Sequence, residues 1–242
     1  MLVRPATHAD LPAIAQLYSE AFDSNAIYRW VFTGDAAQPA PAGALSWLFL
    51  RRARMLLQRG CLLLVGCDAA GQLVAAGGLV PFDRKPGHLD YLRNGILLWL
   101  LWYGLASLHR GLCADEDLAA ARASGALTGV AGELAMVAVR PDMQGCGLGG
   151  RIIAALLEQW DAADGRALAL MTQNPRALHL YGRHGFKWLE SHHPEAKHPQ
   201  GGFSNWVECF QAHAGVVCSM AMHPKGERLL TSSVDGTVKA WV

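Results

Sequence analysis

The sequence predicts an α/β protein in which helices cover a mixed β-sheet. Between residues 133 and 193, apolar strand-like runs alternate with helical patterns, in the order strand, helix, strand, helix, strand. Parallel neighbours in such a series need crossover connections, and the helices supply them. Upstream, two apolar runs joined by the turn DAAG read as a hairpin. With 52% hydrophobic residues among 242, the chain can bury a full core.

The N-terminal part carries a clear helix start. Thr7 is suited to the N-cap position, Asp10 follows three residues later and Pro12 falls in the first turn, so a helix is predicted to reach Phe22. The remaining elements expected before residue 83 are a strand at 2–4, a helix at 44–59, and hairpin strands at 61–67 and 72–82.

An apolar stretch at residues 95–108 is flanked by Arg93 and by His109 and Arg110. It is shorter than the ~20 residues that a spanning helix needs, so no membrane-spanning segment is expected. A buried or dimer-facing helix is the favoured interpretation. An interfacial membrane helix and a substrate lid are the alternatives.

The C-terminal part supplies the rest of the sheet. Residues at helical spacing in the segment 151–160 are assigned to the core: Ile152, Ile153, Leu156, Leu157 and Trp160. A second helix is expected at 175–185, with strands at 133–139, 166–172, 186–193 and 204–210.

Charge and cysteine usage limit the function classes. A net charge of +1 without long Lys/Arg runs argues against nucleic acid as a partner. The six cysteines are scattered without a CxxC pair, and the N-terminus lacks the apolar region of a signal peptide. A reducing, cytoplasmic location is therefore expected.

The stretch QGCGLGG at 144–150 contains four glycines between a predicted strand and a predicted helix. Glycine permits positive φ and lets a ligand approach the amides, and a helix N-terminus favours negative charge, so the stretch is suited to an anion. A P-loop would need Gly-Lys-Ser/Thr at its end, and a dinucleotide fingerprint would need an acid at the end of the next strand. Neither is present.

The pattern that remains is Gln144, Gly147 and Gly149 after Val-Arg-Pro at 139–141. It resembles the pyrophosphate loop of the GNAT superfamily of N-acetyltransferases, which bind acetyl coenzyme A. MVAVRPDMQGCGLGGRIIAALLEQ and NPRALHLYGRHGF resemble two family motifs, in the family's order. The resemblance implies a mixed, mostly antiparallel central sheet with helices on both faces.

The resemblance also implies the residues that hold the coenzyme. Backbone groups of the strand would contact the pantetheine arm, loop amides would hold the pyrophosphate, and Asn174 would bind the arm or cap the following helix. The expected coenzyme-binding residues are Val137, Ala138, Val139, Gln144, Gly145, Cys146, Gly147, Leu148, Gly149, Asn174 and Tyr181.

Two residues are candidates for proton transfer. Glu133 corresponds to a glutamate that acts as a base through water in histone-type relatives; a solvated strand end is the alternative. Tyr181 resembles the family tyrosine that protonates the leaving thiolate; a half-buried core tyrosine is the alternative. His192, His193, Glu195 and His198 lack zinc-site spacing, so no metal is expected.

The predicted organisation is an acetyltransferase domain at 1–211, with a helical insertion at 83–129 expected to shape the acceptor site, and a short all-β tail at 212–242. The tail resembles one WD-repeat blade of three strands joined by HPKG and VDG turns. The expected function is acetyl transfer from acetyl coenzyme A to an unidentified amine by direct attack in a ternary complex. The alternative is a coenzyme-binding or WD-type scaffold protein with little catalysis. A homodimer and a protein partner for the tail stay open.

Overall fold

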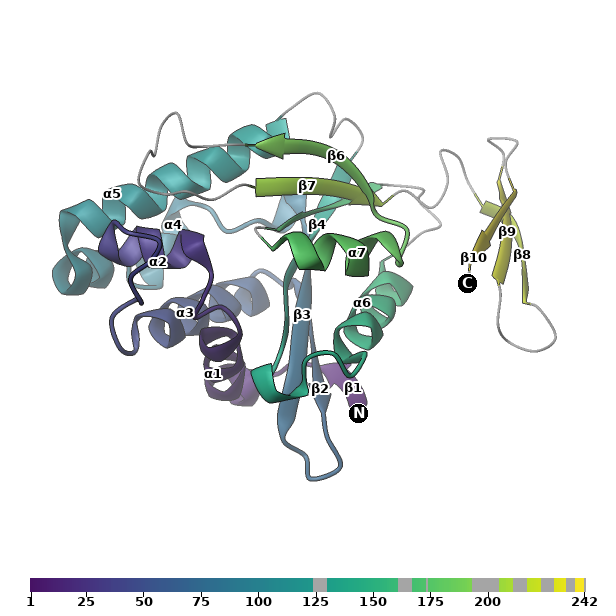
Figure 1. The fold of residues 1–242 in the computed structure, drawn as a ribbon, viewed down its shortest axis with the longest axis horizontal. Helices are drawn as coiled ribbons and strands as arrows, with labels where there is room; N and C mark the ends of the chain where they lie inside the picture. Colours follow the sequence, from purple (N-terminus) through teal and green to yellow (C-terminus); the bar gives the residue numbers. More distant parts are fainter. Residues whose placement is uncertain are drawn as a thin grey trace.

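A seven-stranded sheet organises the chain in this computed structural model, in the order β1-β2-β3-β4-β5-β7-β6 (Figure 1). The structure describes residues 1–123, 130–160, 167–172, 174–192, 205–210, 217–222, 229–233 and 238–241. The strands are β1 (Leu2–Pro5), β2 (Leu62–Cys67), β3 (Leu73–Pro81), β4 (Val130–Val139), β5 (Ala167–Thr172), β6 (Lys187–His192) and β7 (Asn205–Phe210). Only β4 and β5 pair in parallel among these strands, which confirms the mixed, mostly antiparallel sheet.

Helices cover both faces of this sheet, as predicted. Figure 1 shows α1 and α3 on one side of β3 and α6 on the other. The α-helices are α1 (Leu11–Ala21), α2 (Ala26–Thr33), α3 (Ala44–Gln58), α4 (His88–Arg93), α5 (Ile96–Ala123), α6 (Leu148–Gln159) and α7 (Pro175–Gly182). The short helices are η1 (His8–Asp10), η2 (Phe82–Arg84) and η4 (Pro141–Met143).

Alternation along the strands divides the apolar residues between two cores. In β2, Leu63 and Val65 belong to the first core, which α1, α2 and α3 cover, whereas Leu64 belongs to the second core. The second core lies under α6 and α7 and includes Ile152 and Ile153. The helical spacing that assigned these residues of α6 to the core is thereby confirmed.

A β-bulge interrupts the pairing of β3 with β4. Ala76 pairs with Ala138 and Gly78 with Ala135, so Gly77 faces the two residues Met136 and Val137. Met136 has a φ of 53°, a left-handed conformation that is unusual for a residue other than glycine. The bulge bends β4 immediately after its parallel pairing with β5 ends at Leu134.

Helix α5 docks on α2 by one of its faces. The Trp99 ring stacks on Phe32 with centroids 5.3 Å apart, and its Nε1 donates to Ser107 Oγ at 3.0 Å. The Arg110 guanidinium donates to the carbonyls of Val31 and Phe32 at 3.0 and 3.2 Å, which satisfies groups near the C-terminus of α2.

The favoured prediction here is a buried or dimer-facing helix. Its first part is wrong, because several leucines on the other face of α5 are exposed, Leu101 by 75%, whereas a contact with a second copy stays a prediction. The segment Ile96–Ala114, 19 residues, is long and apolar enough to cross a membrane by length and composition alone. Gly104 interrupts it with φ 77° and ψ 168°.

Helix α2, which Asn25 caps, was not anticipated from the sequence, whereas α4 lies in the segment predicted as a helical insertion. In the tail, β8 (Val217–Met222), β9 (Leu229–Ser233) and β10 (Val238–Trp241) form a separate three-stranded antiparallel sheet. These agree with the three strands expected there. The turns HPKG and VDG lie outside the described residues.

We expect Gly77→Ala to lower the free energy of unfolding by about 1–3 kcal/mol through overpacking. An added Cβ would lie 2.9 Å from both Ile152 Cγ2 and Leu156 Cδ1, whose side chains are fully buried. Denaturant unfolding followed by circular dichroism measures the change. Gly182→Ala is the control, because its Cβ would meet no atom within 4 Å. Equal effects of the two substitutions would contradict the close packing of α6 on β3.

Candidate functional site

The connection from β4 to α6 is an open, glycine-rich loop. After η4 the chain passes through Gly145 with φ 80° and Gly147 with φ 76°, and α6 begins at Leu148. A Cβ added at either glycine would meet no atom within 4 Å, so the space beside the backbone is free. Gln144 Nε2 donates to the Val139 carbonyl at 3.2 Å and ties the loop to the end of β4.

The backbone amides of this loop are available to a ligand. Within the described part of the chain, no carbonyl accepts from the N–H groups of residues 145–150. The first amides of a helix have no partner inside it, and they carry the positive end of the helix dipole. Together they can bind an anion such as a phosphate.

The carboxylate of Asp142, just ahead of the loop, is paired with the guanidinium of Arg140. Arg140 Nε lies 2.7 Å from Asp142 Oδ1, and this hydrogen bond lowers the pKa of the Asp142 carboxyl. The pair leaves the loop without a free negative charge from η4.

Helix α7 packs against the start of α6. A Cβ at Gly149 would lie 3.4 Å from Leu180, and His184 Nε2 lies 3.1 Å from the Gly150 carbonyl, to which it donates. Burial lowers the pKa of His184, so the ring is neutral at physiological pH. The two glycines thus allow α7 to approach the loop closely.

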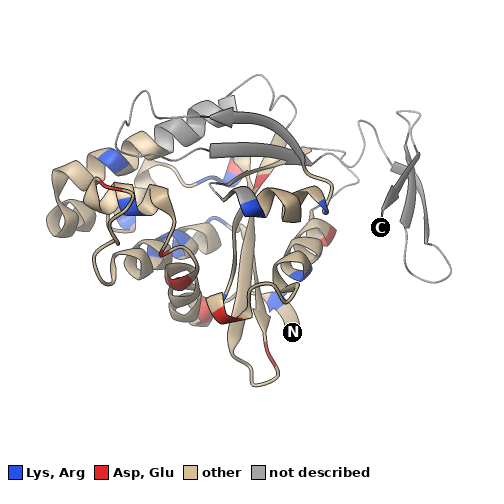
Figure 2. Cartoon of the chain, viewed as in Figure 1, with Lys and Arg blue, Asp and Glu red and all other residues tan. Residues whose placement is uncertain are grey.

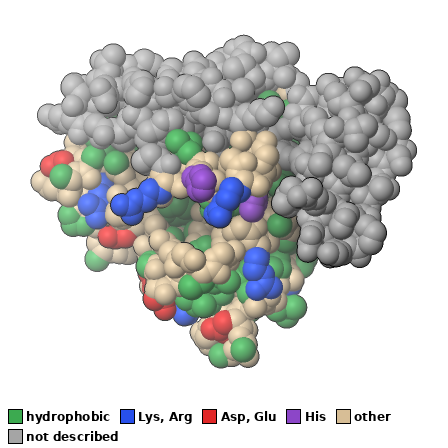
Figure 3. Space-filling model, turned by 45° about the vertical axis from the view of Figure 1, so that its right-hand side comes forward, with side chains coloured by type: hydrophobic (Ala, Val, Ile, Leu, Met, Phe, Trp, Pro, Cys, Tyr) green, Lys and Arg blue, Asp and Glu red, His purple; other side chains and the backbone are tan. Residues whose placement is uncertain are grey.

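Cationic side chains stand beside this loop. Arg176 is the second residue of α7 and Arg183 follows its last residue, and Figure 2 shows Lys or Arg residues at both ends of this helix. In Figure 3, Lys or Arg and His side chains gather across the middle of the face shown. The positive charge of Arg176 and Arg183 adds to that of the helix terminus and attracts a polyanion.

Strands β4 and β5 separate next to the loop. Their parallel pairing runs only from Val130 to Leu134 on β4, after which β5 continues alongside β7. Residues 135–139 of β4 have no strand partner on that edge within the described sheet. Val137 and Val139 are half-buried there, and Ala138 is buried in the first core. An extended ligand could add to this edge as a strand does.

Glu133 lies on the face of the first core. It pairs across the sheet with Val80 of that core, and its side chain is only 12% exposed. Lys85, between η2 and α4, places Nζ 3.9 Å from Glu133 Oε2 and 3.9 Å from the centroid of the Phe82 ring. The carboxylate therefore faces a cation rather than bulk water alone.

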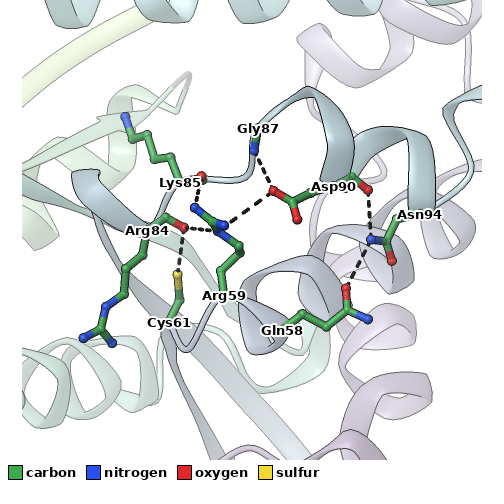
Figure 4. Close-up of polar contacts among 8 residues, drawn as sticks. All are labelled: Gln58, Arg59, Cys61, Arg84, Lys85, Gly87, Asp90 and Asn94. Carbon is green, nitrogen blue, oxygen red and sulfur yellow. Dashed lines mark hydrogen bonds and ion pairs between the residues drawn. The ribbon is translucent and has the colours of Figure 1, made fainter.

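The backbone that carries Lys85 is fixed by a polar cluster (Figure 4). Arg59 donates to the carbonyls of Arg84 and Lys85 at 3.5 and 3.4 Å, and its Nε lies 3.9 Å from Asp90 Oδ2. Asp90 also accepts from the Gly87 amide at 2.8 Å. The Lys85 side chain points away from this cluster, and the ion pair places its amine beside Glu133.

Tyr181 and Asn174 both lie on α7. Tyr181 is 9% exposed in the second core, with its ring 6.0 Å from that of Phe186, and it shares this core with Leu148 at the start of α6. Asn174 caps α7, because its side chain accepts from the Arg176 amide at 3.0 Å. Tyr181 therefore lies beside the loop, whereas Glu133 lies on the opposite face of the sheet.

The loop residues named from the sequence thus come together with Tyr181, whereas Glu133 is grouped with Lys85. Lys85 and the bulge residue Met136 were not found by sequence reasoning. No motif links Lys85 to a glutamate so far along the chain, and nothing in the residue type methionine indicates a positive φ. His193, Glu195 and His198 lie outside the described residues, among which no group of three His, Cys, Asp or Glu could hold a metal.

Comparisons with known proteins agree with this architecture. Residues 108–188 match the model of the acetyltransferase (GNAT) domain, and residues 204–241 match that of the WD domain, G-beta repeat. The second match begins in β7, ahead of the tail expected from residue 212. No curated protein matches the chain.

Several solved structures share the fold. Histone acetyltransferase HPA2 and related acetyltransferase from Corynebacterium glutamicum is 22% identical over 88% of this chain and 98% of its own, with a TM-score of 0.60. A polyamine N-acetyltransferase from Drosophila melanogaster is 15% identical over 87% and 99%, with a TM-score of 0.60. A ribosomal-protein-alanine N-acetyltransferase from Brucella melitensis is 18% identical over 87% and 99%, with a TM-score of 0.53.

At these identities the likeness is one of fold, and the family model adds the sequence match from α5 to β6. Residues 108–188 thus match the model of the acetyltransferase (GNAT) domain, the described chain shares the fold of solved acetyltransferases, and residues 204–241 match a WD repeat.

Proposed function

We propose that this protein transfers an acetyl group from acetyl coenzyme A to an amine by direct attack within a ternary complex. The observation that carries the proposal is the set of unpartnered amides at residues 145–150, next to the unpaired edge of β4. An anion-binding helix terminus and a free strand edge match the two halves of the coenzyme, a pyrophosphate and an amide-containing arm. The coenzyme supplies the activated acetyl group as a thioester.

The loop residues named from the sequence would hold the pyrophosphate, with Arg176 and Arg183 of α7 adding positive charge. Val137, Ala138 and Val139 would offer backbone groups to the arm. Asn174 already caps α7 through its side-chain oxygen, which leaves its amide nitrogen for the arm.

Tyr181 is proposed as the acid that protonates the departing thiolate, because it shares the second core with the start of α6. Glu133 is proposed as the base that draws the proton from the amine through water. Since Lys85 Nζ lies 3.9 Å from Glu133, an acceptor ammonium would compete with Lys85 for the same carboxylate.

The acceptor class is supported by relatives of the same fold that are named for polyamine, agmatine and ribosomal-protein alanine substrates. These acceptors share an amine and differ in size. A thiol-release assay with acetyl coenzyme A and a panel of polyamines, amino acids, small amines and peptides identifies the acceptor here.

The alternative is a coenzyme-binding scaffold with little catalysis, which the WD match at 204–241 favours. A scaffold would bind the coenzyme and release no thiol with any amine.

We expect Gly147→Glu to weaken coenzyme A binding by ~100-fold or more, because a negative side chain would enter the space beside the loop amides. Isothermal titration calorimetry on the folded variant measures this. Gly71→Glu is the matched control, since Gly71 has φ 78° with no atom within 4 Å of an added Cβ and lies in the β2–β3 turn. Both variants carry the same backbone strain. Wild-type affinity in Gly147→Glu would remove the loop from the site.

We expect Tyr181→Phe to leave KM nearly unchanged and to lower kcat by roughly 100-fold, because the ring still packs against Phe186 while the transferable proton is lost. Steady-state thiol release gives both constants. Tyr103→Phe, which removes a hydroxyl from a half-buried ring on α5, should keep wild-type kinetics. An unchanged kcat in Tyr181→Phe would assign this tyrosine to packing alone.

We expect Glu133→Gln to slow the reaction most at low pH, where the acceptor amine is protonated and a base is needed. The pH profile of kcat/KM should lose part of its acidic limb, and an acceptor amine of lower pKa should partly restore the rate. Glu158→Gln, an exposed change on α6, is the control. A wild-type profile for Glu133→Gln would show that positioning alone carries the reaction.

A further inference from the structure

Lys85 places a primary amine beside the carboxylate that the proposed function uses as its base. Its Nζ lies 3.9 Å from Glu133 Oε2, and its side chain is 30% exposed, so a bound molecule can reach it. The order of the chain brings the two together, because Val80 of β3 pairs with Glu133 and Lys85 follows that strand through η2. Lys85 is also the only lysine before residue 187 in the sequence.

The amine of Lys85 is held in place from two sides. Its Nζ lies 3.9 Å from the centroid of the Phe82 ring, whose face attracts a cation. Arg59 fixes the backbone by donating to the carbonyls of Arg84 and Lys85 at 3.5 and 3.4 Å, and Figure 4 shows the Lys85 side chain pointing away from these contacts. A nucleophile that is already ordered loses little entropy on reaching a transition state.

The acetyl group of the proposed complex lies at the same end of β4. The loop amides at 145–150 hold the pyrophosphate, and the arm of the coenzyme runs from there along the unpaired edge, from residue 139 towards residue 135. The thioester ends the arm, so it lies where the pairing of β4 with β5 begins, at Leu134. Glu133 is the adjacent residue, and the thioester and the Lys85 amine therefore meet at its carboxylate.

We propose that this chain acetylates its own Lys85 when acetyl coenzyme A is bound and no other amine occupies the acceptor site. The inference rests on the proposed function, since it uses the same coenzyme site and the same base. It adds a modification site and names an acceptor that is part of the chain itself.

The transfer follows the steps of the proposed reaction, with Lys85 as the amine. Glu133 takes one proton from the Lys85 ammonium and passes it to solvent, and the neutral amine attacks the carbonyl carbon of the thioester. A C–N bond forms and the C–S bond breaks, and the sulfur leaves with the electron pair of that bond. Tyr181 gives the thiolate its proton, and a second proton from the nitrogen replaces it through solvent. The products are ε-acetyl-lysine and the free thiol of coenzyme A.

Acetylation removes the positive charge of Lys85. The amide that forms is no longer a nucleophile, and it has no ionic attraction to Glu133 or to the Phe82 ring. The reaction therefore stops at one acetyl group per chain. In the absence of another acceptor it gives a single burst of thiol rather than continuous turnover.

The test is to incubate the full chain with acetyl coenzyme A alone and to analyse it by peptide mass spectrometry. Trypsin cuts after Arg84 but not between Lys85 and Pro86, so peptide 85–93 is the same whether or not Lys85 is acetylated. We expect this peptide to gain one acetyl group, together with an equal amount of released thiol. The rate should saturate with coenzyme concentration and should not depend on protein concentration, because the transfer is intramolecular.

Variants separate catalysed from chemical acetylation. Glu133→Gln should slow the modification of Lys85 by roughly 100-fold, as the loss of a general base does, and Gly147→Glu should slow it through weaker coenzyme binding. Glu158→Gln, an exposed change on α6, should keep the wild-type rate. Lys85→Arg keeps a positive charge beside Glu133 but offers no amine that loses its proton, so the burst of thiol should disappear.

Three results would overturn the inference, and they differ in what they imply for the proposed function. Thiol release with an added amine, while Lys85 stays unmodified in its absence, would leave the proposed function standing. Acetylation of Lys85 at equal rates in wild type, Glu133→Gln and Gly147→Glu would show an uncatalysed reaction of the coenzyme with an exposed lysine. Absence of thiol release both alone and with every added amine would overturn the proposed function as well.

Discussion

The separation of β4 from β5 is the constraint on which the rest of the domain depends. Parallel pairing stops at Leu134, and the bulge opposite Gly77 turns the following residues away, with Met136 in a left-handed conformation. Gly77 has no side chain, so α6 can pack directly over this bend through Ile152 and Leu156. The packed helix in turn presents its first amides beside the unpaired edge. The bulge in β4 therefore determines the positions of both the unpaired edge of β4 and the N-terminus of α6.

The two cores hold Glu133 and Tyr181 on opposite faces of the sheet near that bend. Glu133 shares the face of Val80 in the first core, whereas Tyr181 is anchored in the second core next to Phe186. If Glu133 and Tyr181 act as the proposed base and acid, their positions on opposite faces of the sheet keep the two groups apart. The two substrates of the proposed direct transfer would then approach from opposite faces of the sheet, where β4 and β5 part.

The sequence predicted most of the sheet because its strands are strongly apolar and are punctuated by glycine and proline. The loop was also predictable, since glycines at a strand-to-helix junction have few other uses. The conformation of Met136 was not, because it is imposed by the mismatch between β3 and β4 rather than by methionine itself. The proximity of Lys85 to Glu133 depends on how η2 leads into α4 and on Arg59 holding that backbone, which are tertiary effects. The exposure of Leu97, Leu101 and Leu105 reverses the usual inference from an apolar run, because α5 packs on its domain through other apolar residues, among them Trp99 and Tyr103.

The position of β7 bears on how the WD match can be read. The matched residues begin at 204, and β7 (Asn205–Phe210) is hydrogen-bonded between β5 and β6, inside the seven-stranded sheet. A propeller blade is a four-stranded sheet, and the remaining strands of the match, β8, β9 and β10, form a sheet of three. Recruiting β7 to complete a blade would remove an interior strand from the seven-stranded sheet, make β5 its edge and take from β6 its only strand partner within the described sheet. Membership of the seven-stranded sheet and membership of a propeller blade are thus competing uses of the same six residues, and in this fold they belong to the sheet.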